Sequence, residues 1–380
     1  MRNSYLILIS CLASIALIYM VLFIYTFFNF HSEFKFTFKS LENLNFHEKY
    51  SKKIHHIRDE IYLDWLWKKP KVEDLLFTTI NTLENKEVIV LFQGDSYMEQ
   101  LTFPGPNKNH ISAELVQKFK SKKKVGFINA GIGSYAPSLM SLQLDILEED
   151  FKIFPNIVIS YIDTTDIGDE NCRYKNNKTY ENGILKSVKP EAYLMYRSIF
   201  NYSRIYGLSR ISLSDSSKIS KTFQLINFKF KYGLKKSIIR FYRKYISNVE
   251  TDKEKVKKCY GAEIHKYMIH DEKTKYFADQ VKEYVAKMEQ KKHIDKIFLV
   301  TFPHKANFNK IYKLNVADVI DSIVQDKKNI THINFSKTLL NDKNFNYENI
   351  WIEDQIHLNP ENHANLFMKK ILEELSKYLQ

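Results

Sequence analysis

Apolar residues follow three kinds of pattern along the chain. A nearly unbroken apolar run covers Tyr5 to Phe30 and is long enough, at 1.5 Å per residue, to cross the hydrocarbon layer of a membrane. Short apolar runs then alternate with segments of helical periodicity, and a central stretch interrupts this alternation. The pattern predicts a transmembrane anchor at 1–30, a helical connector at 31–85 and one domain at 86–380 with an insertion at about 170–270.

The N-terminal run predicts an uncleaved transmembrane helix, and a cleavable signal peptide is the competing interpretation. A signal peptide has a shorter apolar region that ends in a small-residue cleavage site, and Tyr25 to Phe30 supply no such site. Arg2 marks the short tail as cytoplasmic, while Lys35 and Lys39 follow the run, so the charge bias is small. We expect the large domain to lie outside the cytoplasm.

Five short apolar runs are typical of strands buried on both faces of a parallel sheet. They are Glu87–Phe92, Val125–Asn129, Ile157–Tyr161, Ile297–Thr301 and Ile330–Phe335. Helical patterns at 138–151, 274–290 and 361–379 lie between or after them. Strands that alternate with helices imply βαβ crossovers, and hence a three-layer α/β domain. In such a domain the functional site lies beyond the carboxyl ends of the strands.

The charge of the chain limits its partners only in part. Its 57 Lys and Arg against 44 Asp and Glu give a net charge of +13, which suits an anionic membrane, an acidic glycan or nucleic acid. No zinc-finger or helix-turn-helix signature accompanies the spread-out basic residues, so we expect no nucleic acid as a partner.

The basic, aromatic stretch Lys218–Tyr245 predicts a helix. It is a helix packed on the core, a cap over the site, or a membrane-surface patch.

The three cysteines fit an extracytoplasmic domain. Cys11 lies in the apolar run, and Cys172 and Cys259 stand near the two ends of the insertion. In an oxidising compartment these two can form a disulfide that closes the insertion, and the alternative is a pair of unbonded thiols.

The segment Gln93-Gly94-Asp95-Ser96 directly follows the first core strand. A serine there stands on a turn between a strand and a helix, where its hydroxyl is accessible and its amide can face a developing oxyanion. A capped turn without chemistry also explains these residues.

A nucleophilic serine needs a base, and the base needs a group that fixes its tautomer. Asp354 and His357 stand three residues apart, just before the last helix, which Asn359 and Pro360 begin. Together with Ser96 at the end of the first strand, this spacing predicts Ser96 as nucleophile, His357 as base and Asp354 as the orienting acid.

Other polar residues at the strand ends have less specific interpretations. An acidic block follows the third strand and consists of Asp163, Asp166, Asp169 and Glu170. Capping and solvated carboxylates explain this block, and we expect no metal. His304, after the fourth strand, contacts substrate or is a structural loop histidine, and we expect His363 in the last helix to be structural.

The order of these blocks resembles that of the SGNH/GDSL hydrolase superfamily, over roughly residues 86–165 and 295–380. The resemblance rests on Gly94-Asp95-Ser96 with Gln100, on Asn129-Ala130-Gly131 and on Asp354-Gln355-Ile356-His357. It implies a flavodoxin-like fold of five parallel strands, a triad of Ser96, His357 and Asp354, and oxyanion donors from the amides of Ser96 and Gly131. It also implies hydrolysis or transfer of acyl esters, with no metal or organic cofactor.

One block departs from the superfamily pattern. Where Gly-x-Asn-Asp is usual, this chain has Asp163-Thr164-Thr165-Asp166, so Thr165 occupies the place of the oxyanion-binding asparagine. There are three alternatives for the oxyanion hole: Thr165 replaces the asparagine as hydrogen-bond donor, another residue supplies that donor, or the hole has only two donors.

We expect an anchored esterase or O-acyltransferase acting on acyl, chiefly acetyl, esters of cell-envelope polysaccharide. The alternative is a catalytically inert scaffold that binds glycan or a membrane partner in envelope assembly.

Overall fold

The chain forms two compact units. The computed structural model describes residues 2–30, 49–50, 53–54, 76–102, 110–188, 207–245 and 268–380. The first unit comprises residues 1–48, 59–72 and 194–252, and the second comprises residues 49–58, 73–193 and 253–380. Most of the predicted connector at 31–85 lies outside the described residues.

Two long helices dominate the first unit. Helix α1 runs from Arg2 to Phe28, and its segment Tyr5–Phe28 is apolar and long enough to cross a membrane. Length and composition of this kind suit a membrane anchor and also a signal sequence. Helix α8 covers Lys218–Tyr245, the range predicted from the sequence. The two helices are in contact, since the rings of Phe23 and Phe223 lie 4.7 Å apart between centroids.

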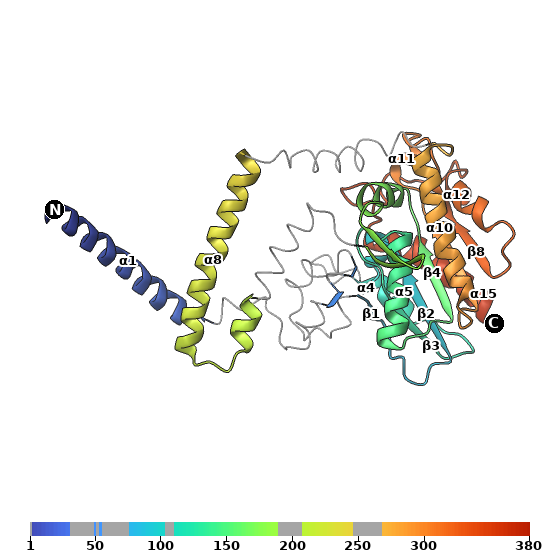
Figure 1. Ribbon diagram of the computed structural model, residues 1–380. Helices are drawn as coiled ribbons and strands as arrows, with labels where there is room; N and C mark the ends of the chain where they lie inside the picture. Colours follow the sequence, from blue (N-terminus) through green and yellow to red (C-terminus); the bar gives the residue numbers. More distant parts are fainter. Residues whose placement is uncertain are drawn as a thin grey trace. The chain divides into compact units, whose positions relative to one another are not determined.

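The second unit is built on a six-stranded sheet with the order β1-β3-β2-β4-β7-β8 (Figure 1). The strands are β1 (Thr78–Thr79), β2 (Val88–Gln93), β3 (Val125–Asn129), β4 (Ile157–Tyr161), β7 (Lys296–Thr301) and β8 (Ile330–Asn334). The short edge strand β1 is antiparallel to β3, and the other five strands are parallel. The predicted α/β class with five parallel strands is confirmed, and each strand agrees with its predicted range to within one residue.

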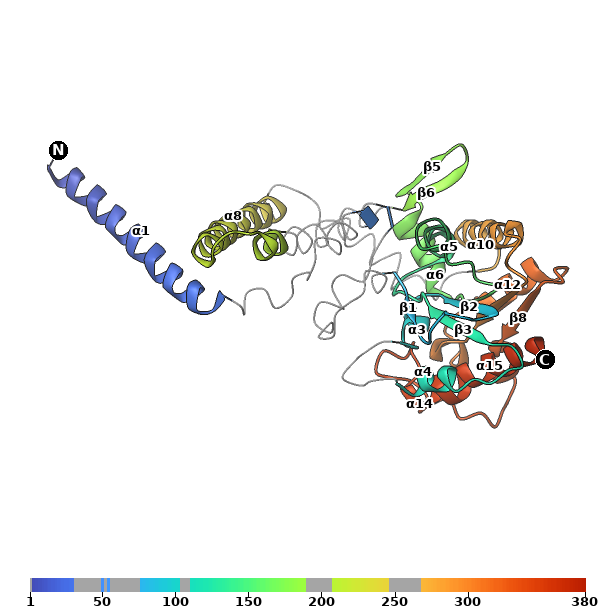
Figure 2. The same cartoon turned by 90° about the horizontal axis from the view of Figure 1, so that it is seen from below.

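Helices cover both faces of this sheet (Figure 2). On one face lie α5 (Pro137–Phe151), α10 (Glu272–Gln290) and α12 (Val316–Val324), and on the other lie α4 (His110–Gln117) and α15 (Lys369–Leu379). This is the three-layer arrangement that strands buried on both faces require.

Short elements connect the strands to these helices. They are α3 (Ser96–Glu99), α6 (Thr165–Gly168), a π-helical turn at Asp169–Tyr174, α11 (Lys305–Phe308), α13 (Phe335–Leu339), α14 (Pro360–Asn362) and a second π-helical turn at His363–Met368. The last predicted helix is therefore continuous in sequence but consists of α14, the second π-helical turn and α15.

The predicted helical insertion also contains a β-hairpin, which its helical patterns do not indicate. Strands β5 (Lys178–Glu181) and β6 (Ile184–Val188) pair antiparallel. Asn182 and Gly183 join them with φ angles of 52° and 76°, the left-handed values of a type I′ turn. The Asn-Gly dipeptide is therefore the signal in the sequence that indicates this hairpin.

The cysteines differ in their bonding. Cys172, in the first π-helical turn, is part of a disulfide, whereas Cys11 is free and exposed on α1. Cys259 lies outside the described residues. A disulfide at Cys172 suits a domain in an oxidising compartment.

Candidate active site

Ser96 begins helix α3 at the carboxyl end of the central strand β2. Gly94 precedes it with a φ of 151°, and a Cβ at this position would lie only 3.0 Å from the Cβ of Tyr161. Asp95 caps α3 by accepting the amide of Tyr97 at 2.8 Å. The amide of Ser96, at the first helical position, donates to no group in the described part of the chain.

The loop after β3 is held against α3 by Asn129. Its side chain accepts the amide of Gly131 at 3.0 Å and donates to the carbonyl of Met98 at 3.1 Å. A Cβ at Gly131 would lie 2.6 Å from the amide nitrogen of Glu99, so only glycine fits here without displacing α3. This close packing positions the loop beside Gly94, the residue that follows β2.

Asp354 and His357 lie on a loop that is closed by a bridge between Trp351 and Leu358. One carboxylate oxygen of Asp354 accepts the amides of Ile356 and His357, each at 2.9 Å. Its other oxygen lies 2.5 Å from Nδ1 of His357. The carboxylate therefore fixes both the backbone of the loop and the orientation of the imidazole.

The loop directs His357 at Ser96. Nε2 of His357 lies 2.8 Å from Oγ of Ser96, so a chain of hydrogen bonds joins Asp354, His357 and Ser96. Burial by itself would raise the pKa of Asp354, but hydrogen bonds from His357 and from the amide of Ile356 hold it below its ordinary value. Asp354 is therefore ionised near neutral pH and can stabilise a protonated imidazole.

Thr165 has a different environment from the one expected of an oxyanion donor. Its amide and its hydroxyl both donate to the carboxylate of Asp163, each at 2.6 Å. The other oxygen of Asp163 lies 2.9 Å from Nε2 of His304. In this conformation the Thr165 hydroxyl proton is directed at Asp163 and not at a ligand.

Asp163 and His304, which follow strands β4 and β7, form a buried pair. Each side chain is only 1% exposed. Burial would raise the pKa of Asp163, but the charge of His304 and the hydrogen bonds from His304 and Thr165 lower it. Of the two interpretations given for His304, its burial favours the structural one. Sequence patterns do not predict this pairing, because the two residues follow different strands.

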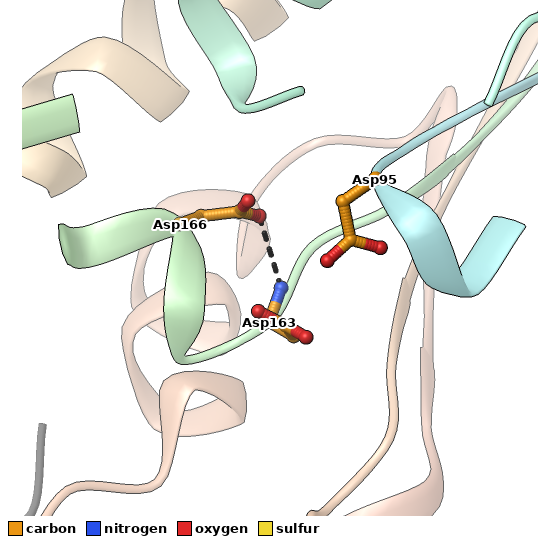
Figure 3. Close-up of side chains that lie close together, drawn as sticks. All are labelled: Asp95, Asp163 and Asp166. Atoms are coloured by element: carbon orange, nitrogen blue, oxygen red, sulfur yellow. Dashed lines mark hydrogen bonds between the residues drawn. The ribbon is translucent and has the colours of Figure 1, made fainter. Parts of the chain in front are cut away.

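Three carboxylates from the turns after β2 and β4 lie close together (Figure 3). Oxygen atoms of Asp95, Asp163 and Asp166 lie within 4.8 Å of one another, and all three side chains are buried. Burial, and next the negative charge of Asp163, raise the pKa of Asp95 and of Asp166 well above the ordinary value. These two carboxyls therefore hold their protons to a higher pH than exposed aspartates, which reduces their repulsion.

The same three carboxylates are the residues that could hold a cation, since hard cations bind oxygen ligands. However, the oxygens of Asp163 are already bonded to Thr165 and His304. The remaining two members of the predicted acidic block lie apart from this group: Asp169 pairs with Arg173 at 3.1 Å and Glu170 with Lys178 at 2.8 Å.

Two further residues support the turn that carries Ser96. Glu99 is not among the predicted site residues, but its buried carboxylate accepts the amide of Gly133 at 3.0 Å. His363 is also buried, with Nδ1 2.8 Å from the hydroxyl of Ser112 and Nε2 3.1 Å from the carbonyl of Tyr97. Burial lowers the pKa of His363 to about 4, so its ring is neutral near pH 7. A glutamate one turn after Gly-Asp-Ser is the only sequence signal for Glu99.

Comparisons with known proteins give structural neighbours alone. No protein-family model matches the sequence, and no curated protein matches it. Among solved structures, a catalytic mutant of Axe2, an acetylxylan esterase from Geobacillus stearothermophilus, is 12% identical with a TM-score of 0.38, over 76% of this chain and 94% of that chain. A second Axe2 mutant, described as an acetyl-xylooligosaccharide esterase, is 11% identical with a TM-score of 0.37 over the same shares. Similarity at this level does not establish a shared activity.

Proposed function

We propose that the protein is a serine esterase or O-acyltransferase of the SGNH/GDSL type. The observation that supports this most directly is the chain of hydrogen bonds from Asp354 through His357 to Ser96, with 2.8 Å between Nε2 and Oγ. A serine, a base and an orienting acid in this geometry have the roles that nucleophilic acyl transfer needs.

The reaction begins when an ester carbonyl lies against Oγ of Ser96. His357 accepts the hydroxyl proton as Oγ attacks the carbonyl carbon, and Asp354 stabilises the imidazolium that forms. His357 then gives the proton to the departing alcohol, which leaves an acyl group on Ser96. Water or a sugar hydroxyl, deprotonated by His357 in turn, attacks this acyl-enzyme and releases the serine.

The developing oxyanion needs donors that point at it. The amide of Ser96 has no competing acceptor in the described parts of the chain, and it is the first donor we assign. The amide of Gly131 becomes a second donor when it exchanges its bond to Asn129 for one to the oxyanion. Thr165 contributes a donor only after its hydroxyl turns away from Asp163.

The substrate we propose is an acyl ester, chiefly an acetyl ester, on a polysaccharide of the cell envelope. Helix α1 would hold the enzyme at the membrane, because its segment Tyr5–Phe28 is long and apolar enough to span a bilayer. We place the catalytic unit outside the cytoplasm, in a compartment where the disulfide of Cys172 is stable. The net charge of +13 suits an acidic polymer.

A product assay tests the proposal and separates hydrolysis from transfer. Purified protein is incubated with an acetylated glycan, and free acetate and acetylated Ser96 are measured by mass spectrometry, with Ser96→Ala as the control. Free acetate without an acceptor supports hydrolysis, and an acyl-enzyme that disappears only when glycan is added supports transfer. A folded wild-type protein that gives neither product with a panel of acyl esters contradicts the proposal and supports the inert scaffold.

A further inference from the structure

Helix α8 combines a strongly basic sequence with an apolar stripe. Its 28 residues include nine Lys and Arg and no Asp or Glu. Five large apolar side chains are 45–65% exposed. They are Ile219, Phe223, Phe230, Leu234 and Ile238. Spacings of four and seven residues place them along one side of the helix.

Lysines occupy the other side of the same helix. Lys218, Lys229 and Lys235 are exposed and lie out of phase with the stripe. A helix with this separation of apolar and basic residues is suited to lie in the plane of a membrane interface, with its apolar side among the acyl chains and its lysines among anionic headgroups. Exposed aromatic and aliphatic side chains in a row would be unfavourable in water alone.

Aromatic side chains of the stripe hold α8 beside α1, since Phe223 and Phe230 contact Phe23 and Tyr19 of that helix. The hydroxyl of Tyr19 donates to Asn227 at 2.8 Å, and the ring of Phe23 contacts that of Phe223. At 1.5 Å per residue, Tyr19 lies about 13 Å from the C-terminal end of α1 at Phe28, so α8 meets α1 inside the segment that can cross a bilayer.

The surface between the two helices is apolar as well. A groove there is lined by α1 side chains from Leu12 to Phe23 and by Phe223 of α8. An acyl chain has the chemistry to fill it. The positive charge of α8 alone would suit any acidic polymer. An anionic bilayer, which is apolar inside and charged at its surface, matches both the apolar and the basic side of this helix.

We propose that α8 is a second membrane contact, which lies on the anionic phospholipid leaflet in which α1 ends. It buries its apolar stripe among the acyl chains and directs its lysines at the lipid phosphates. The inference rests on the membrane-spanning role proposed for α1 and is independent of the chemistry of Ser96. It gives the first unit two attachments to the same bilayer, one across it and one along it.

Photo-crosslinking of the full chain in vesicles tests this inference. A diazirine amino acid replaces Leu234 or Ile238 on the stripe, or Lys229 or Lys235 on the basic side as matched controls. Vesicles contain phosphatidylcholine alone or phosphatidylcholine with phosphatidylglycerol, and lipid adducts are counted by mass spectrometry. We expect several-fold more lipid adducts from positions 234 and 238 than from 229 and 235, and a further several-fold increase when phosphatidylglycerol is present.

A charge-reversal variant tests the role of the lysines. In Lys229→Glu/Lys231→Glu/Lys235→Glu, lipid adducts from position 234 should fall several-fold, whereas the equal charge change Lys120→Glu/Lys122→Glu/Lys123→Glu in the second unit should leave them unchanged. Equal adducts from both sides of α8, adducts to protein in place of lipid, or a stripe signal unaffected by charge reversal would overturn the inference. Extraction of the protein by alkaline carbonate would instead contradict the role of α1.

Discussion

Nε2 of His357 lies 2.8 Å from Oγ of Ser96, although the two residues are 261 positions apart along the chain. The parallel sheet explains this proximity, because β2 ends at the edge to which the loop before the last helix returns. Asp354 then holds the imidazole through Nδ1, which leaves Nε2 to face the hydroxyl.

Removing the base should cost more activity than removing the acid. His357→Ala is expected to slow acyl-enzyme formation by about a thousand-fold or more, because no proton acceptor for Ser96 remains. Asp354→Ala should slow it less, since His357 can still accept the proton when poorly oriented. Rates of ester cleavage measure both, and Glu353→Ala, an exposed neighbour, is the control that should match wild type. Equal losses in the two variants would contradict a mainly orienting role for Asp354.

Gly131→Ala should reduce both stability and activity. The new Cβ would lie 2.6 Å from the amide nitrogen of Glu99, so α3 and Ser96 must move. We expect a loss of roughly 1–3 kcal/mol in the free energy of unfolding, as for other overpacked sites, together with slower ester cleavage. Gly233→Ala on exposed α8 adds the same methyl group with nothing within 4 Å and should not lower stability. Wild-type behaviour of Gly131→Ala would refute this account of the loop.

Thr165→Val distinguishes the alternatives for the oxyanion hole. Because the Thr165 hydroxyl donates to Asp163, its loss should lower activity by less than about ten-fold, whereas loss of an oxyanion donor costs about a hundred- to a thousand-fold in kcat. Thr164→Val, a change in a neighbouring buried threonine, is the control. A hundred-fold fall for Thr165→Val alone would assign its hydroxyl to the oxyanion hole.

His363 should make the second unit sensitive to acid. Its pKa is about 4 in the folded protein and near 6.5 when unfolded, so between these values the unfolded state binds a proton that the folded state does not. The contribution of the neutral ring to the free energy of unfolding is complete above pH 6.5 and is lost as the pH falls towards 4. The loss is on the order of 3 kcal/mol. The free energy of unfolding, measured at several pH values, should fall less over this window in His363→Asn than in the wild type. Parallel curves for variant and wild type would show that His363 does not cause it.

Much of the fold could be predicted from the sequence because buried parallel strands leave unbroken apolar runs. Val125–Asn129 and Ile157–Tyr161 are predicted at their observed bounds for this reason. The hairpin around Asn182 and Gly183 carries a recognisable turn signal, but it lies in a stretch where helical patterns dominate.

The site could be predicted in part. Ser96 and the Asp354/His357 pair lie in short local motifs, and the order of the strands brings the ends of those motifs to one edge of the sheet. The contact of Asp163 with His304 depends on how two separate loops pack, and no local pattern records it. The same packing turns the Thr165 hydroxyl towards Asp163, which residue identity alone does not reveal.

Covalent labelling of Ser96 tests the central claim most directly. The wild-type protein, Ser96→Ala and His357→Ala are treated with a fluorophosphonate probe, and the modified residue is located by mass spectrometry. We expect the wild type to be labelled at Ser96 and both variants to lose the label. A folded wild type that stays unlabelled, or a label that persists in Ser96→Ala, would contradict it.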